Sequence, residues 1–500
     1  MPVAVTYSSA EIGIDAPRVT VEVDVSPGLP QVLIVGMAET AVRESKDRIR
    51  AAFRSCGLKF PDKRITVNLA PADLPKTGGR YDLAIAIAIL AANGEINEPS
   101  LASHEFLGEL SLTGELRGVG GVLPAAVRPG GKGSSLIVPA ANVDEAALSP
   151  GNNVFTSRSL MEVISYLNDG KPLSPTQRVP AAAVASAGPG LSDVRGQQAA
   201  KRALMIAAAG GHNLLMVGPP GTGKTMLANR LPALLPVLSQ SEALEVASIV
   251  SVSGHALDTQ RWRQRPFRAP HHTTSAVALV GGSRPPTPGE ISLAHHGILF
   301  LDELPEFPRR VLEVLREPLE SGEIWISRAG RQVRFPAKFQ LVAAMNPCPC
   351  GHYGDEPTPC RCPPDVVERY RTRLSGPLLD RIDLQVQVPR PPEGTLQDQV
   401  EPEGAQTARS RVEAASRTAL ARQGVTNSGL TGKQLEIHCI LDAADLTLLE
   451  NAVSRLGLSV RGYFRVLRVA RTIADLEGQA KIGADALLEA LSYRSVIGKR

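Results

Sequence analysis

The chain has 500 residues, which is too long for one ordinary hydrophobic core and predicts about two to four domains. Aromatic residues are only 4% of the sequence and the net charge is only +4, so aliphatic side chains must fill the cores and any nucleic-acid surface must be local. No apolar run reaches about 18 residues and the first residues lack a signal-peptide pattern, which excludes a membrane-spanning helix and predicts a cytoplasmic protein without a membrane partner.

Residues 1–170 alternate short β-rich runs with alanine-rich helical ones, as in an α+β domain. Gln31–Val35 and Arg64–Leu69 have the composition of strands, and Arg43–Cys56 has that of a helix. Residues 171–190 are rich in Pro, Ala, Ser and Gly and carry few charges, which predicts a linker.

Residues 191–390 contain apolar strands at the spacing of a doubly wound α/β domain. The strand Asn213–Val217 runs into a sequence that fits the G-x-x-x-x-G-K-[ST] phosphate loop. Its glycines allow a tight turn that brings backbone N–H groups onto phosphates, and a helix should begin near Lys224. Lys224 should reach the β- and γ-phosphates of ATP, and Thr225 should bind Mg²⁺. The loop residues are Gly218, Pro219, Pro220, Gly221, Thr222, Gly223, Lys224 and Thr225.

A second apolar strand, Ile298–Leu301, ends in two acids. Asp302 is predicted to bind Mg²⁺, either directly or through a water, and Glu303 is placed to orient and deprotonate the attacking water. The phosphate loop and the acid pair together predict a nucleoside triphosphatase that hydrolyses its nucleotide.

Two β-rich runs, Glu323–Ser327 and Gln332–Phe335, follow a helix predicted over Arg309–Ser321. A short Ala-Gly turn joins the runs, which predicts a hairpin whose tip is flanked by Arg328 and Arg331. In a ring of six subunits such tips would point arginines into the pore, where they could bind DNA phosphates. The alternative is a surface hairpin with solvated arginines.

The next buried strand, Phe339–Met345, ends at Asn346, whose amide could contact the γ-phosphate or the attacking water. Arg381 lies just before another apolar strand and is the best candidate for an arginine finger that reaches the ATP of a neighbouring subunit. Arg371 and Arg373 are the alternatives. A finger of this kind makes hydrolysis depend on an oligomer.

Residues 391–500 begin with a polar, breaker-rich stretch and are then helical by periodicity, which predicts a C-terminal lid. A long helix opens at Leu458–Arg465, and Arg461 within it is predicted to act on the γ-phosphate.

Four of the six cysteines form two C-x-C pairs separated by nine residues: Cys348, Cys350, Cys360 and Cys362. Four thiols in one loop could supply a tetrahedral Zn²⁺ site. The C-x-C spacing is tighter than the usual C-x₂-C, so reduced free thiols and a redox disulfide remain alternatives.

The stretch Arg261–Arg268 interleaves four arginines with two aromatics, which suits either single-strand binding or a contact between protomers. The pairs His271–His272 and His295–His296 are not predicted to bind a metal, because adjacent histidines point in different directions on regular structure.

Residues 5–495 resemble the ComM/YifB family within the magnesium-chelatase-type AAA+ proteins. The most specific stretches are Val67–Leu74, Arg268–Thr273, Pro288–Gly297 and Val469–Leu476. The resemblance implies an AAA+ core in which Asn346 is sensor 1, Arg381 the arginine finger and Arg461 sensor 2. Members of the family are hexameric ATPases, so a homo-hexamer that uses ATP and Mg²⁺ is expected.

The function implied by this resemblance is helicase and branch-migration activity on single-stranded and branched DNA, during homologous recombination and natural transformation. Recombination proteins are candidate partners. The alternative is a motor that remodels proteins or inserts a metal, as magnesium-chelatase motors do, without DNA translocation.

Residues 1–170 resemble the Lon-protease fold, which is similar to domain 2 of ribosomal protein S5. Arg80 falls where the nucleophilic serine of Lon proteases should be, and Leu123 falls where the catalytic lysine should be. A serine–lysine dyad needs a hydroxyl and an amine within hydrogen-bond reach, so no peptidase activity is expected. The expected role of this domain is assembly or DNA contact.

Overall fold

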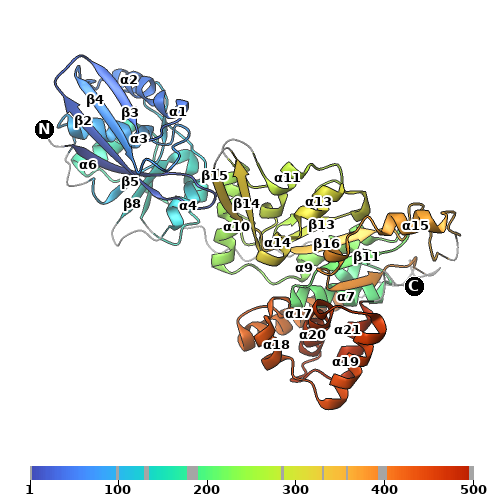
Figure 1. The fold of residues 1–500 in the computed structure, drawn as a ribbon. Helices are drawn as coiled ribbons and strands as arrows, with labels where there is room; N and C mark the ends of the chain where they lie inside the picture. The colour runs from blue at the N-terminus through green and yellow to red at the C-terminus, as the bar shows by residue number, and fades with distance from the viewer. Residues whose placement is uncertain are drawn as a thin grey trace.

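The computed structural model describes residues 3–96, 101–128, 134–151, 153–176, 190–282, 286–328, 331–355, 358–391 and 403–494, without the side chains at 328, 331 and 403–406. Three regions follow one another along the molecule, from the N-terminal sheets at one end to a helical region at the other (Figure 1). Most of the predicted linker, residues 177–189, lies outside the described residues. Within the described parts, no helix is both long and apolar enough to cross a bilayer.

The N-terminal region is built on two four-stranded sheets of order β1-β2-β4-β3 and β10-β9-β8-β5. The helix α3 is buried over nearly its whole length and contacts β1 and β2, because its side chains are apolar on every face. The strands are β1 (Ala4–Ser9), β2 (Arg18–Ser26), β3 (Gln31–Val35), β4 (Arg64–Ala70), β5 (His104–Phe106), β6 (Glu109–Leu110), β7 (Leu116–Arg117), β8 (Ser135–Pro139), β9 (Val154–Ser157) and β10 (Ser174–Pro175). The helices are α1 (Thr40–Arg43), α2 (Ser45–Ser55), α3 (Asp82–Ala92), α4 (Val122–Val127), α5 (Val143–Ala146) and α6 (Leu160–Asp169).

The central region contains a five-stranded sheet of order β12-β13-β16-β11-β17, with every neighbouring pair parallel. Its central strands are buried on both faces, which explains their nearly continuous apolar sequences. The strands are β11 (Leu214–Val217), β12 (Phe267–Arg268), β13 (Ile298–Leu301), β16 (Gln340–Met345) and β17 (Leu384–Gln387). The helices are α7 (Gln198–Gly210), α8 (Lys224–Ala228), α9 (Leu231–Leu234), α10 (Gln240–Ser253), α11 (Ala276–Val280), α12 (Glu290–Leu293), α13 (Arg309–Val314), α14 (Pro318–Ser321), α15 (Pro364–Arg371) and α16 (Gly376–Leu379).

Alternation along these strands sends side chains to two different cores. Leu214, Met216 and Phe300 pack with the C-terminal helices, whereas Leu215 and Leu299 pack on the opposite face, which also holds the hairpin. The period of two therefore decides which partner covers which face of the sheet.

The C-terminal region is helical and contains no strand among the described residues 403–494, as the sequence predicts. It packs on the central region through α7, and its helices share that region's core (Figure 1). The helices are α17 (Glu403–Gln423), α18 (Gly432–His438), α19 (Ala443–Leu456), α20 (Val460–Leu476) and α21 (Ala484–Ser492).

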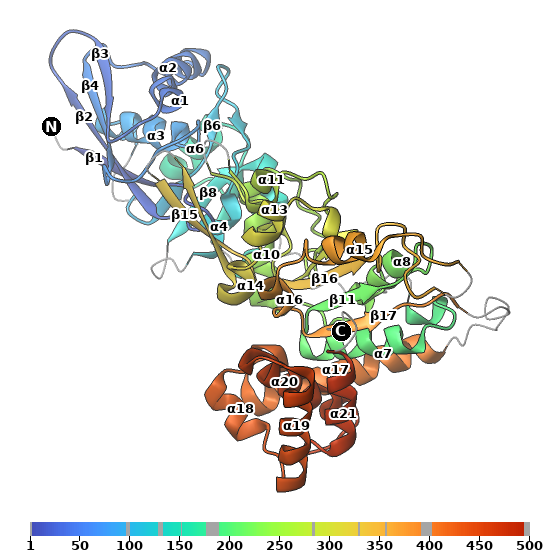
Figure 2. The ribbon, with the colours of Figure 1, turned by 45° about the vertical axis from the view of Figure 1, so that its right-hand side comes forward.

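The predicted hairpin is confirmed as β14 (Glu323–Arg328) paired antiparallel with β15 (Arg331–Pro336). The single helix predicted over 309–321 is wrong: α13 ends at Val314 and α14 begins at Pro318, because proline cannot continue the hydrogen-bonding of a preceding helix. The hairpin points from the central region toward the N-terminal region (Figure 2).

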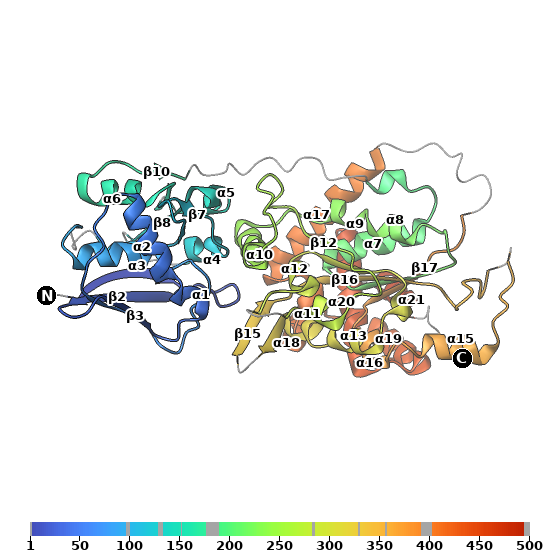
Figure 3. The same cartoon turned by 90° about the horizontal axis from the view of Figure 1, so that it is seen from above.

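The N-terminal and central regions meet at two places. Ile12 and Ile14, in the loop after β1, pack on the core that includes the hairpin. The Ser251 hydroxyl at the end of α10 donates to the Glu145 carboxylate at 2.6 Å. Figure 3 shows α10 on the side of the central region that faces α4, and the two helices are in contact.

Candidate nucleotide-binding site and its surroundings

The phosphate loop follows β11 at the carboxyl edge of the central sheet. Helix α8 begins at Lys224, as predicted, and its N-cap Gly223 has φ +88°. A Cβ on Gly218 would collide with the carbonyl oxygen of Val388, so only glycine fits there. The buried Lys224 ammonium group donates to the carbonyl oxygens of Gly218 and Pro219 at 2.7 and 2.8 Å. Burial lowers the pKa of Lys224.

The acid pair reaches the same edge from the end of β13. The Thr225 hydroxyl donates to Asp302 Oδ2 at 2.6 Å. Hydroxyl and carboxylate oxygens are the ligands that Mg²⁺ prefers, so this pair fits the metal. Glu303 has φ +51°, a left-handed conformation that costs roughly 1–2 kcal/mol for a non-glycine residue and concentrates at functional sites.

Asn346 completes the group at the end of β16. Its Oδ1 lies 3.2 Å from Lys224 Nζ. The strands β13, β16 and β11 are adjacent and parallel, so their carboxyl ends meet at one edge. The fold thereby brings the phosphate loop, the acid pair and Asn346 together.

His272 is a member of this site that sequence reasoning did not assign to it. Its Nδ1 lies 3.1 Å from the Glu303 carboxylate. His272 follows β12, the neighbour of β13 in the sheet, and no local pattern relates it to Glu303. The strand order of the sheet, which places β12 beside β13, is what brings the two residues together.

Arg381 lies at the opposite, amino edge of the sheet. It lies three residues before β17, which runs parallel to β11 with Leu214 opposite Leu384. The whole four-residue length of β11, about 13 Å, therefore separates this end of the sheet from the phosphate loop. Arg381 is buried, and its Nη2 pairs with Glu320 Oε1 at 2.6 Å beside a hollow of about 350 Å³. Arg461 is 3.6 Å from the same carboxylate. The two predicted arginines therefore converge on Glu320, away from their own phosphate loop.

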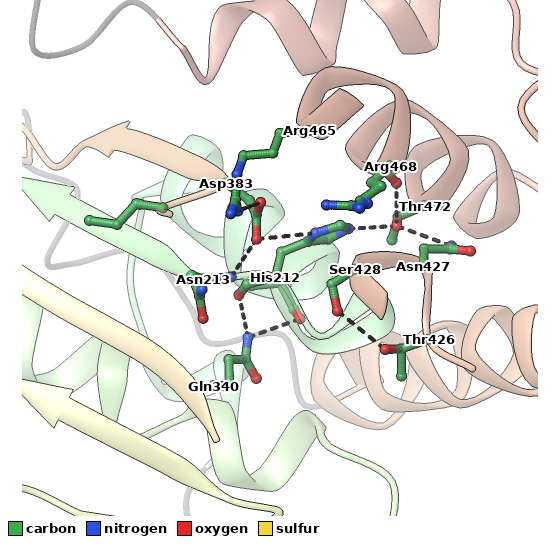
Figure 4. A network of polar contacts seen from close by, with 12 residues as sticks. His212, Asn213, Gln340, Asp383, Thr426, Asn427, Ser428, Arg465, Arg468 and Thr472 are labelled. Atoms are coloured by element: carbon green, nitrogen blue, oxygen red, sulfur yellow. Dashed lines mark hydrogen bonds and ion pairs between the residues drawn. The ribbon is translucent and has the colours of Figure 1, made fainter. Parts of the chain in front are cut away.

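A buried polar network continues from this edge into the C-terminal helices (Figure 4). Asp383 accepts from the backbone N–H of Asn213 at 3.0 Å and forms an ion pair with Arg465 of α20. Burial opposes ionisation of Asp383, but Arg465 and His212 lower its pKa well below the usual range. His212 bridges the two regions, with Nε2 at 2.7 Å from the Thr472 hydroxyl.

The hairpin presents an apolar face to the core and a polar face outward. Trp325 is 52% exposed and lies opposite Arg334 across the two strands. Arg328 and Arg331 form the last backbone pair before the tip, and their side chains lie outside the described part of the chain. An exposed tryptophan beside an arginine suits stacking on a nucleic-acid base. The alternation Ile-Trp-Ile in the sequence could have indicated this outward tryptophan.

Most arginines of the stretch 261–268 are used inside the central region, so this stretch is not a continuous surface for nucleic acid. Arg263 donates to Leu238 O, Arg265 donates to Pro236 O at 2.7 Å, and Arg268 forms a bidentate pair with Glu290. Arg261 remains 73% exposed.

The expectation that adjacent histidines diverge is wrong for His295 and His296. Their rings lie 4.0 Å apart and both bond to Glu245, at 3.0 and 2.9 Å. His296 has φ +53°, so the backbone is not regular there and both rings reach one side.

The four cysteines of the two C-x-C pairs come together, and their sulfur atoms all lie within 4.8 Å of one another. Cys348 is buried, and its Sγ is 3.3 Å from Cys350 Sγ and 3.6 Å from Cys360 Sγ. The backbone N–H groups of His352 and Arg361 lower the pKa of Cys350 to about 6.

The two positions compared with a protease dyad also lie near each other. Arg80 is buried and pairs with Glu11 at 3.0 Å, and its second nitrogen donates to Gly121 O at 3.3 Å. Leu123 is fully buried against Leu148 and Ala247 of α10, so it serves the contact between regions.

Comparisons with known proteins cover the whole described architecture. The family profile described as magnesium chelatase, subunit ChlI, matches residues 190–396, and the profile of its C-terminal part matches residues 402–494. A profile described as subunit ChlI of Mg-chelatase matches residues 21–142.

Individual relatives agree with these profiles. The chain is 50% identical over 502 residues to the competence protein ComM of Haemophilus influenzae, covering 99% of this chain and 98% of that protein. It is 48% identical over 502 residues to the YifB protein of Salmonella typhimurium, with the same coverage. Against the magnesium-chelatase 38 kDa subunit of Cereibacter sphaeroides it is 26% identical, over 61% of this chain and 91% of that subunit. The chain therefore belongs to the ComM/YifB family of magnesium-chelatase-like AAA+ proteins.

Proposed function

We propose that this protein is a hexameric ATPase that moves along DNA and drives branch migration. The observation that carries the proposal is the division of the sheet into two edges. One edge gathers Lys224, Asp302 and Glu303, and the other presents Arg381 and Arg461, which lie away from that group. Such a subunit can complete its site with a neighbour's arginines.

Each residue at the carboxyl edge has a separate role in ATP hydrolysis. Lys224 exchanges its bonds to two backbone carbonyls for bonds to phosphate oxygens, and Glu303 removes a proton from the attacking water. Thr225 and Asp302 supply oxygen ligands for Mg²⁺, which would neutralise phosphate charge. Asn346 is placed to orient the γ-phosphate or the water.

The arginines at the amino edge require a second subunit. An arginine finger stabilises negative charge in the transition state of phosphoryl transfer and typically raises the rate by about 10³–10⁵. Arg381 is held by Glu320, so formation of the oligomer must exchange that ion pair for a contact with the neighbour's nucleotide. Hydrolysis by separated subunits should consequently be slow.

The hairpin is the proposed DNA contact. Trp325 can stack on a base and Arg334 can bind a phosphate, beside Arg328 and Arg331 near the tip. The name of the relative from Haemophilus influenzae connects that protein with competence, so we place this chain in recombination of incoming DNA during natural transformation. ATP and Mg²⁺ are the cofactors of this function, and recombination proteins are candidate partners.

For residues 1–170 we propose a Lon-protease-like fold that has lost the dyad and supports the hairpin. Ile12 and Ile14 pack on the hairpin's core, and the backbone of Gly13 lies against Val333 and Arg334 of β15. Movements of the N-terminal region would therefore be passed to the hairpin.

A second candidate function is a motor that remodels a protein or a metal complex without DNA, which the magnesium-chelatase profiles favour. The rate of ATP hydrolysis without DNA, with single-stranded DNA and with branched DNA distinguishes the two. Stimulation that is strongest with branched DNA supports the DNA motor, and Glu303→Gln provides the blank. A rate indifferent to DNA in a confirmed hexamer favours the second function.

The hairpin contact has its own variant and control. Trp325→Ala should reduce DNA stimulation and leave the basal ATPase rate nearly unchanged. Arg369→Ala removes an exposed arginine of α15, also on the central region, and should change neither rate. Equal stimulation in Trp325→Ala and wild type would contradict a role for this face of the hairpin.

A further inference from the structure

The four-cysteine cluster has the dimensions of a tetrahedral metal site. A zinc ion bound at about 2.3 Å by four thiolates places neighbouring sulfur atoms about 3.8 Å apart. The sulfur–sulfur distances of 3.3, 3.6 and 3.6 Å among Cys348, Cys350 and Cys360 are close to this value. Cys362 completes the set, with its sulfur within 4.8 Å of each of the others.

The geometry argues against a disulfide and fits a bound metal. All four cysteines are free, and the 3.3 Å between Cys348 Sγ and Cys350 Sγ is well beyond a disulfide bond of about 2.05 Å. The backbone N–H of Cys362 points at Cys360 Sγ from 3.4 Å, which suits a thiolate held in place. Four sulfur ligands at tetrahedral spacing select zinc or an iron–sulfur centre, and Zn²⁺ is the usual ion of structural four-cysteine sites.

The cysteine loop adjoins the nucleotide site on two sides. Cys348 lies two residues after Asn346, whose amide contacts Lys224. Gly351 has φ +87°, and a Cβ there would come within 2.6 Å of Pro220 Cδ. The loop backbone therefore lies directly against the phosphate loop.

The same loop is fixed to the helix that follows it. The Arg371 guanidinium donates to the carbonyl oxygen of Pro347 at 3.2 Å and lies over the ring of Tyr353, 4.7 Å from its centroid. An ion bound by the cysteines would therefore link the phosphate loop, the end of β16 at Asn346 and helix α15.

We propose that Cys348, Cys350, Cys360 and Cys362 bind one structural Zn²⁺, and that this ion holds Asn346 and Gly351 in place against the phosphate loop. Zn²⁺ binds all four cysteines as thiolates, any proton still held by a thiol is released to solvent, and no electron transfer or further reactant is needed. The positioning part of this inference rests on the proposed ATPase function, whereas the metal site does not.

Metal analysis of the full-length protein, purified without chelator, tests the site itself. We expect about one zinc per chain in the wild type and almost none in Cys360→Ser/Cys362→Ser. Cys56→Ser is the matched control, because Cys56 lies in the N-terminal region outside the cluster. Wild-type protein that lacks metal and takes up neither Zn²⁺ nor Co²⁺ with the absorption of a tetrahedral thiolate complex would overturn the site.

Nucleotide binding and turnover test the positioning role. A displacement of about 1 Å can cost about 100-fold in rate, so zinc removal should weaken binding of a fluorescent ATP analogue and slow ATP turnover by roughly 10- to 100-fold. Zinc added back to chelated wild type should restore both, which separates a local effect from unfolding of the variant. Zinc-free protein with wild-type affinity and turnover would refute the positioning role. Absence of ATPase activity in zinc-loaded wild type would instead count against the proposed function.

Discussion

The two edges of the central sheet have opposite characters, although the same strands form both. At the carboxyl edge Glu303 is 54% exposed and Thr225 is exposed, so the groups proposed to meet the attacking water and Mg²⁺ are open to solvent. At the amino edge His212 and Asp383 are 0% and 4% exposed and are joined to the C-terminal helices. The carboxyl edge is suited to receive a ligand, and the amino edge is suited to hold the C-terminal helices.

The candidate arginine finger, Arg381, is in direct contact with the C-terminal helices. Arg465 of α20 donates to the carbonyl oxygen of Arg381 at 3.1 Å and also pairs with Asp383. A shift of α20 would therefore move Arg381, and in the proposed hexamer this would change the position of the arginine presented to the neighbouring subunit.

Removing the candidate arginine finger, Arg381, should have the largest effect on ATP turnover. Arg381→Ala is expected to lower ATP turnover by about 10³-fold, while nucleotide binding persists because the phosphate loop is intact. Arg316→Ala is the matched control, since Arg316 lines the same hollow. Mixing Arg381→Ala with Lys224→Ala subunits should recover activity at interfaces that combine both intact groups. No recovery in mixed hexamers would indicate that Arg381 acts only within its own subunit.

Breaking the buried pair at the amino edge should mainly affect stability. Asp383→Asn leaves the Arg465 guanidinium without its partner carboxylate, at an expected cost of about 3 kcal/mol. Thermal unfolding should show an earlier transition of the C-terminal helices, while nucleotide binding at the carboxyl edge persists. An unchanged transition would mean that the pair contributes no net stability.

Acidification should reduce the difference in stability between wild type and Asp383→Asn. The native pKa of Asp383 is lowered, so its ionisation stabilises the fold above the unfolded value of about 3.9, and that contribution is lost as the pH falls toward the native pKa. The stability gap between wild type and Asp383→Asn should be constant from about pH 5 to pH 8 and shrink below about pH 4. Denaturant unfolding at several pH values measures the gap, and a gap that widens on acidification would contradict the assignment.

Releasing Glu303 from His272 should have the smallest effect. A partly exposed contact between a histidine and a carboxylate contributes at most about 1 kcal/mol, so His272→Ala should raise the DNA-independent ATPase rate by no more than about fivefold. The rise is expected because the carboxylate is freed to meet water. A fall of more than about tenfold would instead show that His272 holds Glu303 in its productive position.

Short sequence patterns predict the features that depend on local backbone geometry. The phosphate loop, the start of α8 at Lys224, the hairpin and the helical C-terminal region follow from short patterns of glycine, charge and periodicity. The catalytic roles of Glu303, Asn346, Arg381 and Arg461, and the domain boundaries, remain predictions that these patterns support.

Contacts between residues that are distant in sequence come from the packing of the whole chain. Strand order pairs His272 with Glu303, and alternation along the sheet assigns the lid to one face and the hairpin to the other. The tertiary structure also shows that Arg263 and Arg265 make internal contacts and that the cysteine loop lies against Pro220. These contacts join positions far apart in the chain. Their geometry is set by packing of whole elements rather than by the residues on either side.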